Sequence, residues 1–115
     1  MNKVILFAFR GDPMCFVHVL LNGLDMAERG QEGKIIIEGD AVKLIPEMAQ
    51  PDHFLHQLYL RAVKTDIIIG ACRACSTKLG VAAAIEQEGV RLVGDMSGHP
   101  AMSDYIARGY TIITF

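Results

Sequence analysis

Five short apolar runs, separated by segments of helical periodicity, constrain the fold of this 115-residue chain more than any other feature. The runs are rich in isoleucine and valine, as the fully buried strands of parallel sheets are. They cover residues 4–9, 34–38, 67–69, 90–94 and 110–115. The helical segments between them cover residues 14–29, 41–48, 54–64, 81–88 and 100–108. This alternation predicts one doubly wound domain over residues 1–115, a three-layer α/β/α fold with a mostly parallel five-stranded sheet.

Three loops that carry sulfur and polar side chains are expected at one edge of that sheet. They follow the first, third and fourth strands and have the sequences RGDPMC, GACRACS and GDMSGHP. Right-handed crossovers put the carboxyl ends of all the parallel strands on the same edge, where open α/β sheets bind their ligands. The residues expected there are Cys15, His18, Cys72, Cys75, Asp95, Ser97 and His99. We therefore expect the functional site at this edge.

Cys72 and Cys75 form a CxxC motif directly after the third predicted strand. We expect a helix to begin after the motif, capped by the serine or threonine at position 76 or 77. Thiols close to a helix start, with Arg73 and Lys78 nearby, are in a setting that favours the thiolate. His99, in a loop with glycine and serine, suits a proton donor or a contact to substrate.

Three interpretations of the cysteines remain open from spacing alone. The motif can be two small buried residues at a tight turn, because cysteine packs as a small hydrophobe. Cys15, His18, Cys72 and Cys75 would supply a Cys3His set for zinc if two loops met. The pair can also do redox or nucleophilic work. We expect Cys15 to approach the CxxC loop, although packing in the core is the default for Cys15 and His18. No nucleotide-binding motif is present, and no cofactor is predicted.

Composition narrows the class of protein further. The formal net charge is −2, which gives no basis for electrostatic capture of nucleic acid or of an anionic membrane. The apolar runs are far shorter than the roughly 20 residues that cross a bilayer, and no signal-peptide cleavage site follows the first run. We therefore expect a cytosolic protein, in which a reducing environment keeps the three cysteines as thiols.

The segments ILFAFRGDPMCFVHVLLNGLDM, GACRACSTKLG and GDMSGHPAM resemble the DsrE-like family of small cytosolic proteins. The resemblance extends over nearly the whole chain, and it implies a flavodoxin-like α/β sheet and assembly into homo-oligomers, often trimers or hexamers. Characterised members relay sulfur as a persulfide on one cysteine after the third strand, followed eight residues later by a glycine. In this chain these positions fall on Cys72 and Gly80. Cys75 is an extra thiol that many relay members lack.

This resemblance implies a sulfurtransferase or sulfur carrier that exchanges sulfur with donor and acceptor proteins. Cys72 would attack a donor persulfide and accept its outer sulfur, Cys75 would release that sulfur by forming a disulfide, and His99 would supply or take a proton. The alternative is an oligomeric binding or redox-sensing module, in which the cysteines hold a metal or form a disulfide without turnover.

Assembly is also expected from the residues themselves. The segment 110–115 (YTIITF) is too apolar for an exposed edge strand, and the surface near Met96 and Met102 is predicted to be partly apolar. We therefore expect a homo-oligomer, with the resemblance indicating a trimer or a hexamer built from trimers.

Overall fold

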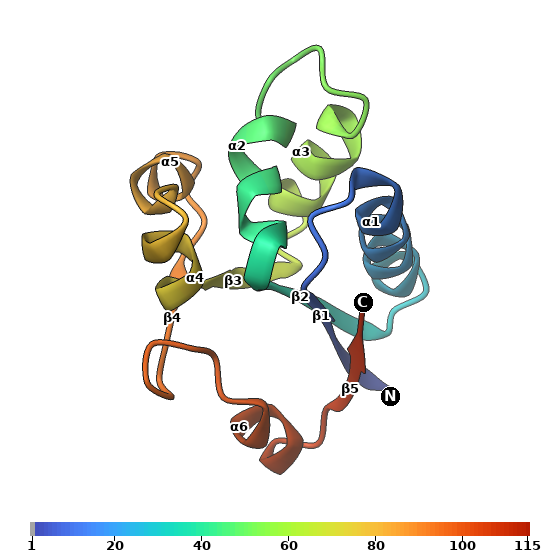
Figure 1. The fold of residues 1–115 in the computed structure, drawn as a ribbon. Helices are drawn as coiled ribbons and strands as arrows, with labels where there is room; N and C mark the ends of the chain where they lie inside the picture. Colours follow the sequence, from blue (N-terminus) through green and yellow to red (C-terminus); the bar gives the residue numbers. More distant parts are fainter. Residues whose placement is uncertain (1) are drawn as a thin grey trace.

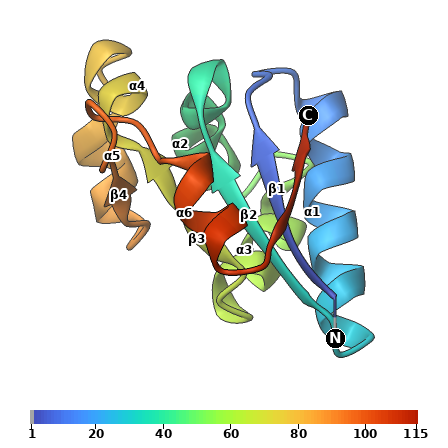
Figure 2. The same ribbon diagram turned by 90° about the horizontal axis from the view of Figure 1, so that it is seen from below.

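A five-stranded sheet, in which all neighbouring strands are parallel, runs through the computed structural model, which describes residues 2–115. The strands are β1 (Lys3–Ala8), β2 (Glu32–Ile37), β3 (Ile68–Cys72), β4 (Leu92–Val93) and β5 (Thr111–Thr114). Their order is β4-β3-β2-β1-β5, so the shortest strand, β4, and the C-terminal β5 lie at the two edges (Figure 2). The predicted five-stranded parallel sheet is confirmed.

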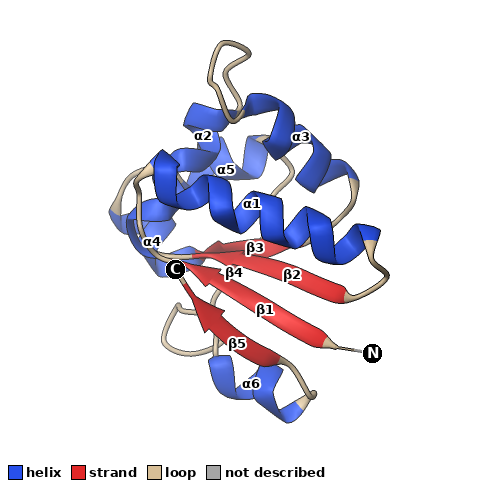
Figure 3. Ribbon diagram, turned by 90° about the vertical axis from the view of Figure 1, so that its right-hand side faces the viewer, coloured by secondary structure: helices blue, strands red, loops and turns tan. Residues whose placement is uncertain are grey.

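Helices lie on both faces of this sheet, but very unequally. The helical elements are α1 (Pro13–Glu28), the 3₁₀ helix η1 (Gly39–Lys43), α2 (Leu44–Met48), α3 (His56–Lys64), α4 (Arg73–Lys78), α5 (Ala82–Gln87) and α6 (Met102–Ala107). α1 to α5 lie on one face, and α6 lies on the other (Figures 1 and 3). The three-layer α/β/α arrangement is therefore confirmed, with one thick helical layer and one thin layer.

The core follows this asymmetry. The larger apolar cluster packs the sheet against α1, α2 and α3 and includes Phe16, Leu20 and Tyr59. A smaller cluster on the other face holds Ile5, Phe7, Ile36 and Tyr105 of α6. The central strands contribute side chains to both faces, which explains why their sequences are continuous apolar runs rather than alternating ones.

The chain reverses its direction of winding at the β3–β4 pair. From β1 to β4 each crossover runs over the face that carries α1 to α5, and the next strand is added on the same side. The crossover from β4 to β5 instead runs over the face that carries α6 and returns to the far edge beside β1. This order differs from the 2-1-3-4-5 order of flavodoxin. The loops after β3 and β4 therefore leave neighbouring strands toward opposite faces.

Two elements near this reversal differ from the sequence-based expectation. A helix, α4, begins inside the CxxC motif at Arg73. The helix predicted over residues 81–88 is a separate second helix, α5. Cys72, not residue 76 or 77, is the N-cap, because its sulfur accepts a hydrogen bond from the Cys75 amide. β4 contains two residues where five were expected, since only Ala71 and Cys72 of β3 pair with it.

Along residues 2–115, the helices are all too short or too polar to cross a membrane.

Candidate functional site

Four side chains meet where β3 and β4 send their loops to opposite faces. They are Glu38, Cys72, Cys75 and His99, and one potential ligand atom of each lies within 4.8 Å of those of the other three. Glu38 follows β2, the cysteines lie at the junction of β3 and α4, and His99 lies in the loop after β4. Neighbouring β2, β3 and β4 thus each supply part of the cluster at their carboxyl ends, the edge at which open α/β sheets bind ligands.

Cys72 is at the centre of the cluster and is fully buried. Its Sγ lies 3.1 Å from His99 Nδ1 and accepts a hydrogen bond from the Cys75 amide at 3.4 Å. Its thiol also points toward the carbonyl oxygen of Gly98, at 3.7 Å. The Ser76 hydroxyl donates to the carbonyl of Cys72 at 2.7 Å and so fixes the turn in which the CxxC motif lies. Cys75 is half-buried, and its Sγ lies 4.0 Å from His99 Nδ1.

His99 is positioned by a tight turn in the loop after β4. The amides and carbonyls of Met96 and His99 form two reciprocal hydrogen bonds of 2.8 Å, with Ser97 and Gly98 at the turn between them. Both turn residues have positive φ, at 51° for Ser97 and 88° for Gly98. The Ala74 amide of α4 donates to the Gly98 carbonyl at 2.8 Å. The turn is thereby attached to the helix that carries Cys75.

Glu38, which directly follows β2, is the fourth member of the cluster. Only 6% of the residue is exposed, and its Oε1 lies 3.8 Å from His99 Nδ1. Burial raises the pKa of the Glu38 carboxyl, because the charged form loses its hydration. The charge of His99 and hydrogen bonds with Cys72 and His99 act in the opposite direction and favour the carboxylate.

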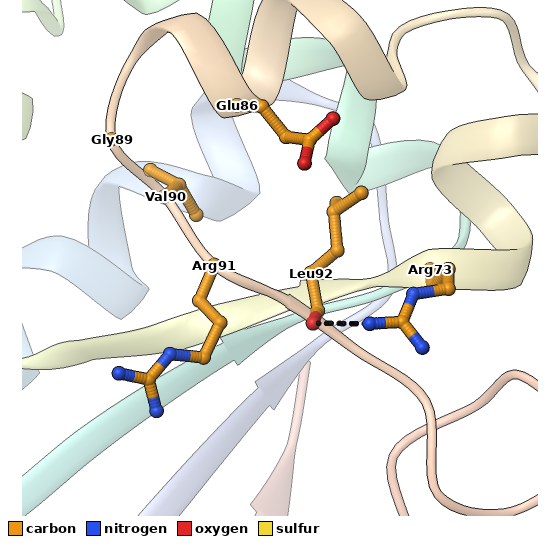
Figure 4. Close-up of a pocket in the computed structure, with 6 residues that line it drawn as sticks. All are labelled: Arg73, Glu86, Gly89, Val90, Arg91 and Leu92. Carbon is orange, nitrogen blue, oxygen red and sulfur yellow. Dashed lines mark hydrogen bonds between the residues drawn. The ribbon is translucent and has the colours of Figure 1, made fainter.

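The environment of Cys72 does not favour a thiolate. Burial, together with the side chains of Cys75 and Glu38, raises the pKa of the Cys72 thiol to about 12, and the Cys75 amide only partly offsets this. The Arg73 guanidinium, expected to help, instead donates to the carbonyl of Leu92 at 3.2 Å (Figure 4). Lys78 is exposed at the end of α4. The expected activation by nearby cations is therefore wrong.

Figure 4 shows where the Arg73 side chain lies instead. It lines a surface pocket beside β4, together with Glu86, Gly89, Val90, Arg91 and Leu92. None of the four clustered side chains lines this pocket. Arg73 is thus adjacent to the cysteines in sequence but contributes to a different surface.

Cys15 and His18 are not part of the cluster. They line a separate pocket with Arg10 and Phe115, and the Cys15 thiol faces an Asp12 carboxylate oxygen at 4.0 Å. The physical reason is strand order, because β2 lies between β1, which carries the Cys15 loop, and β3. The Cys15, His18, Cys72 and Cys75 set proposed for zinc is therefore not assembled. Asp95 and Ser97 are exposed in the loop after β4 and also lie outside the cluster.

Glu38 is the member of the cluster that the sequence-based prediction missed. The prediction considered the loops after the first, third and fourth strands and omitted the second, whose neighbour in the sheet is β3. The sequence signal that could have identified Glu38 is its position as the single acidic residue at the end of the apolar run KIIIE. A carboxylate at the carboxyl end of a buried strand points to the same edge as the other loops and is costly to bury without a partner.

A pocket on the α6 side borders the cluster at Glu38 and His99. Glu38 and His99 lie in its wall with mostly apolar neighbours, namely Phe9, Met96, Pro100, Met102 and Ser103. Met96 is well exposed at the rim. The polar groups of the cluster therefore face an opening that also offers apolar contact area.

Fold and cluster together define a class: a three-layer parallel α/β protein with two cysteines, a histidine and a glutamate at the point where the winding reverses. The chain belongs to the same family as the uncharacterized protein MJ0733 of Methanocaldococcus jannaschii, with 33% identity over 97 residues, 84% of this chain and 77% of the relative. An uncharacterized protein of Archaeoglobus fulgidus is 46% identical over 40 residues, which are 35% of this chain and 66% of that protein. No protein-family model and no solved structure matches the chain.

Proposed function

We propose that this protein handles sulfur and carries a sulfur atom as a persulfide on Cys72. The observation that carries the proposal is the 3.1 Å separation between Cys72 Sγ and His99 Nδ1. A thiol within hydrogen-bond reach of an imidazole can transfer its proton to that base as it attacks an electrophile. The raised pKa of Cys72 makes this base necessary, because little thiolate forms without it at neutral pH.

In the proposed reaction a persulfide donor, RS–SH, presents its outer sulfur to Cys72. His99 takes the thiol proton, a bond forms between Cys72 Sγ and the outer sulfur, and the S–S bond of the donor breaks. The donor leaves as a thiolate with the bonding electron pair and regains a proton from the His99 imidazolium. The products are the Cys72 persulfide and RSH, so no external oxidant or reductant is needed.

Cys75 offers a second way to unload the sulfur. An acceptor thiol can take the outer sulfur by the reverse of the loading step. Alternatively, the Cys75 thiolate attacks Cys72 Sγ, forms a disulfide and releases HS⁻, after which an external dithiol reduces the disulfide. The two sulfur atoms belong to a cluster with ligand atoms within 4.8 Å of one another, which makes this attack a short-range step.

Loading requires the loop over Cys72 to move. The side chain is fully buried, and the turn at Gly98 lies directly against its sulfur. The proposal therefore includes displacement of residues 94–99 when a donor binds. Donor and acceptor proteins, a homo-oligomeric assembly and a cytosolic location are part of the same proposal.

The test is intact-mass spectrometry of the metal-free protein after treatment with glutathione persulfide, followed by peptide mapping of the modified cysteine. We expect an adduct of about 32 Da, one sulfur atom, on Cys72. Cys72→Ser should abolish it, and His99→Asn should slow loading by roughly 10²- to 10⁴-fold, the usual contribution of a positioned base. Cys75→Ser should retain the adduct and prolong its lifetime.

Cys15→Ser is the matched control, because it removes a thiol that lies outside the cluster. It should load sulfur like the parent. Loading of Cys72→Ser at the parental rate, or adducts mapping equally to all three cysteines, would contradict the proposal.

A further inference from the structure

The four clustered side chains match the ligands of a thiolate-binding transition metal. Two sulfurs, one imidazole nitrogen and one carboxylate converge from three separate segments of the chain. Zinc binds four such ligands at about 2.3 Å from sulfur and 2.0–2.2 Å from nitrogen or oxygen. Ligands at tetrahedral angles around one ion are then about 3.3 to 3.8 Å apart.

The separations within the cluster are compatible with this geometry, since all of them are within 4.8 Å. His99 Nδ1 lies 3.1 Å from Cys72 Sγ, 4.0 Å from Cys75 Sγ and 3.8 Å from Glu38 Oε1. Shifts of less than about 1 Å would bring all three contacts into the tetrahedral range. Cys72 and Glu38 are buried, at the end of β3 and directly after β2, whereas Cys75 in α4 and His99 in the loop after β4 are half-buried.

The charges of the clustered groups also favour a bound cation. Buried carboxylates are usually paired with a cation or coordinate a metal. Within residues 2–115, Glu38 has one ion-pair partner, His99, which is charged only when protonated. Arg73, the cationic residue inside the CxxC motif, donates to the Leu92 carbonyl instead. The cluster therefore gathers three groups that can become anions without a permanent cation among them, and a divalent ion would supply it.

We infer that Glu38, Cys72, Cys75 and His99 bind one Zn²⁺ ion per chain. Two thiolates with an imidazole favour zinc over magnesium or calcium, which prefer all-oxygen ligands. The inference does not depend on sulfur transfer. It does imply that zinc and a persulfide exclude each other, because both require Cys72 Sγ.

The test is titration of the metal-free, reduced protein with Co²⁺, followed by competition with Zn²⁺. We expect one ion per chain, visible absorption bands of tetrahedral cobalt and a near-ultraviolet thiolate-to-cobalt band, all lost on adding Zn²⁺. Cys72→Ser, Cys75→Ser and His99→Asn should each weaken binding by more than the roughly 10- to 100-fold typical of outer-shell changes. Glu38→Gln should weaken it and alter the visible bands.

Two matched controls separate this site from general thiol or carboxylate binding. Cys15→Ser removes the third thiol, and Glu47→Gln removes an exposed carboxylate on α2; both should bind cobalt like the parent. The inference is overturned by an octahedral or absent cobalt spectrum, by loss of binding in Cys15→Ser, or by unchanged binding in Glu38→Gln. Circular dichroism confirms that each variant is folded. If a variant does not fold, the half-exposed His99→Asn decides the outcome.

Sulfur loading measured after chelation keeps the two proposals distinguishable. Chelated protein that loads a persulfide but never binds cobalt would contradict the zinc site alone. Protein that binds cobalt but never loads sulfur after chelation would contradict the proposed function alone.

Discussion

Glu38 and Cys72 show how one buried environment sets the reactivity of a thiol. Burial is the largest cause of the raised pKa of Cys72, and the nearby Glu38 charge raises it further. The carboxylate thus opposes formation of a thiolate when the site holds no metal. The same carboxylate would stabilise a zinc ion, because it then faces a cation. The preferred state of this residue pair therefore depends on what occupies the site.

Alkylation of metal-free protein should reveal this raised pKa. Because the pKa of Cys72 is about 12, its thiolate is scarce at neutral pH, and the rate of reaction with iodoacetamide should keep increasing above pH 9. An unperturbed cysteine would reach half of its maximal rate near its ordinary pKa of about 8.5 and would level off by about pH 10. Glu38→Gln removes a negative charge and should accelerate the reaction at a given pH. Peptide mapping by mass spectrometry follows Cys72 separately from the other thiols.

Glu47→Gln is the control for this experiment, since it changes the net charge equally but at an exposed position. Its profile should coincide with that of the parent. A rate for Cys72 that levels off by about pH 10, as expected of an unperturbed thiol, would show that its thiol is not held in the protonated form.

At the residue scale, the sequence predicted some members of the site and not others. CxxC and the loop histidine were found because unusual residue types follow predicted strands. Glu38 was missed, and Cys15 was wrongly placed beside the motif, for one reason: neither assignment can be made without knowing which strands are neighbours. Strand order depends on crossovers between distant segments, and no local pattern encodes it. The likeness to DsrE-like proteins remains a prediction.

At the scale of elements, the loop after β4 determines where His99 lies. Its turn approaches α4 so closely that a Cβ added at Gly98 would lie 3.0 Å from the Ala74 Cβ. Gly98 also has a φ of 88°, which favours glycine. Gly80, the glycine of the predicted family spacing, has a φ of 73° and open space around it just after α4. Gly80 therefore allows α4 to end, whereas Gly98 allows the turn before His99 to pack against α4.

Gly98→Ala should displace His99 from Cys72 as well as destabilise the fold. An alanine at positive φ costs roughly 1–2 kcal/mol, and the contact with Ala74 adds to that cost. Gly109→Ala is the matched control, because Gly109 has a φ of 92° but no atom within 4 Å of an added Cβ. Urea unfolding should show a larger loss for Gly98→Ala, and only this variant should weaken cobalt binding. Equal losses and unchanged binding would contradict the role given to the loop.

The strands and helices were predicted well in kind and less well in extent. Continuous apolar runs identify buried strands, and β1 and β2 were found within two residues of their true bounds. β3 was predicted over residues 67–69 and instead extends to Cys72, because the small residues Gly70 and Ala71 do not continue the apolar run. β4 was predicted too long, because its length is set by the two residues with which β3 pairs. The start of α4 was missed, since a cysteine sulfur acts as its cap where a serine or threonine is usual.

At the scale of the whole molecule, the β5 edge of the sheet exposes apolar side chains. β5 is an edge strand with most of its residues exposed, including Ile113, and Met96 and Ile106 expose further apolar surface. Apolar edge strands pair readily with other chains. We therefore predict a homo-oligomer, with a trimer or hexamer expected from the resemblance.

Light scattering coupled to size-exclusion chromatography measures this directly against the monomer mass of 12.6 kDa. Ile113→Lys should reduce the assembled fraction, because a lysine on an edge strand opposes pairing. A parent protein that elutes as a clean monomer at micromolar concentration would contradict the prediction.

The contact between Cys72 and His99 joins residues 27 positions apart, and Glu38 comes from a third, still more distant segment. Only the two cysteines of the cluster lie in one short stretch of chain, so the complete cluster forms only after the end of β2, the end of β3 and the loop after β4 have come together. Contacts of such large sequence separation form late, because the intervening chain must first lose its freedom. A newly made chain would therefore pass through a period in which Cys72 and Cys75 are separated from Glu38 and His99, and the order of events during folding decides when the four groups first meet.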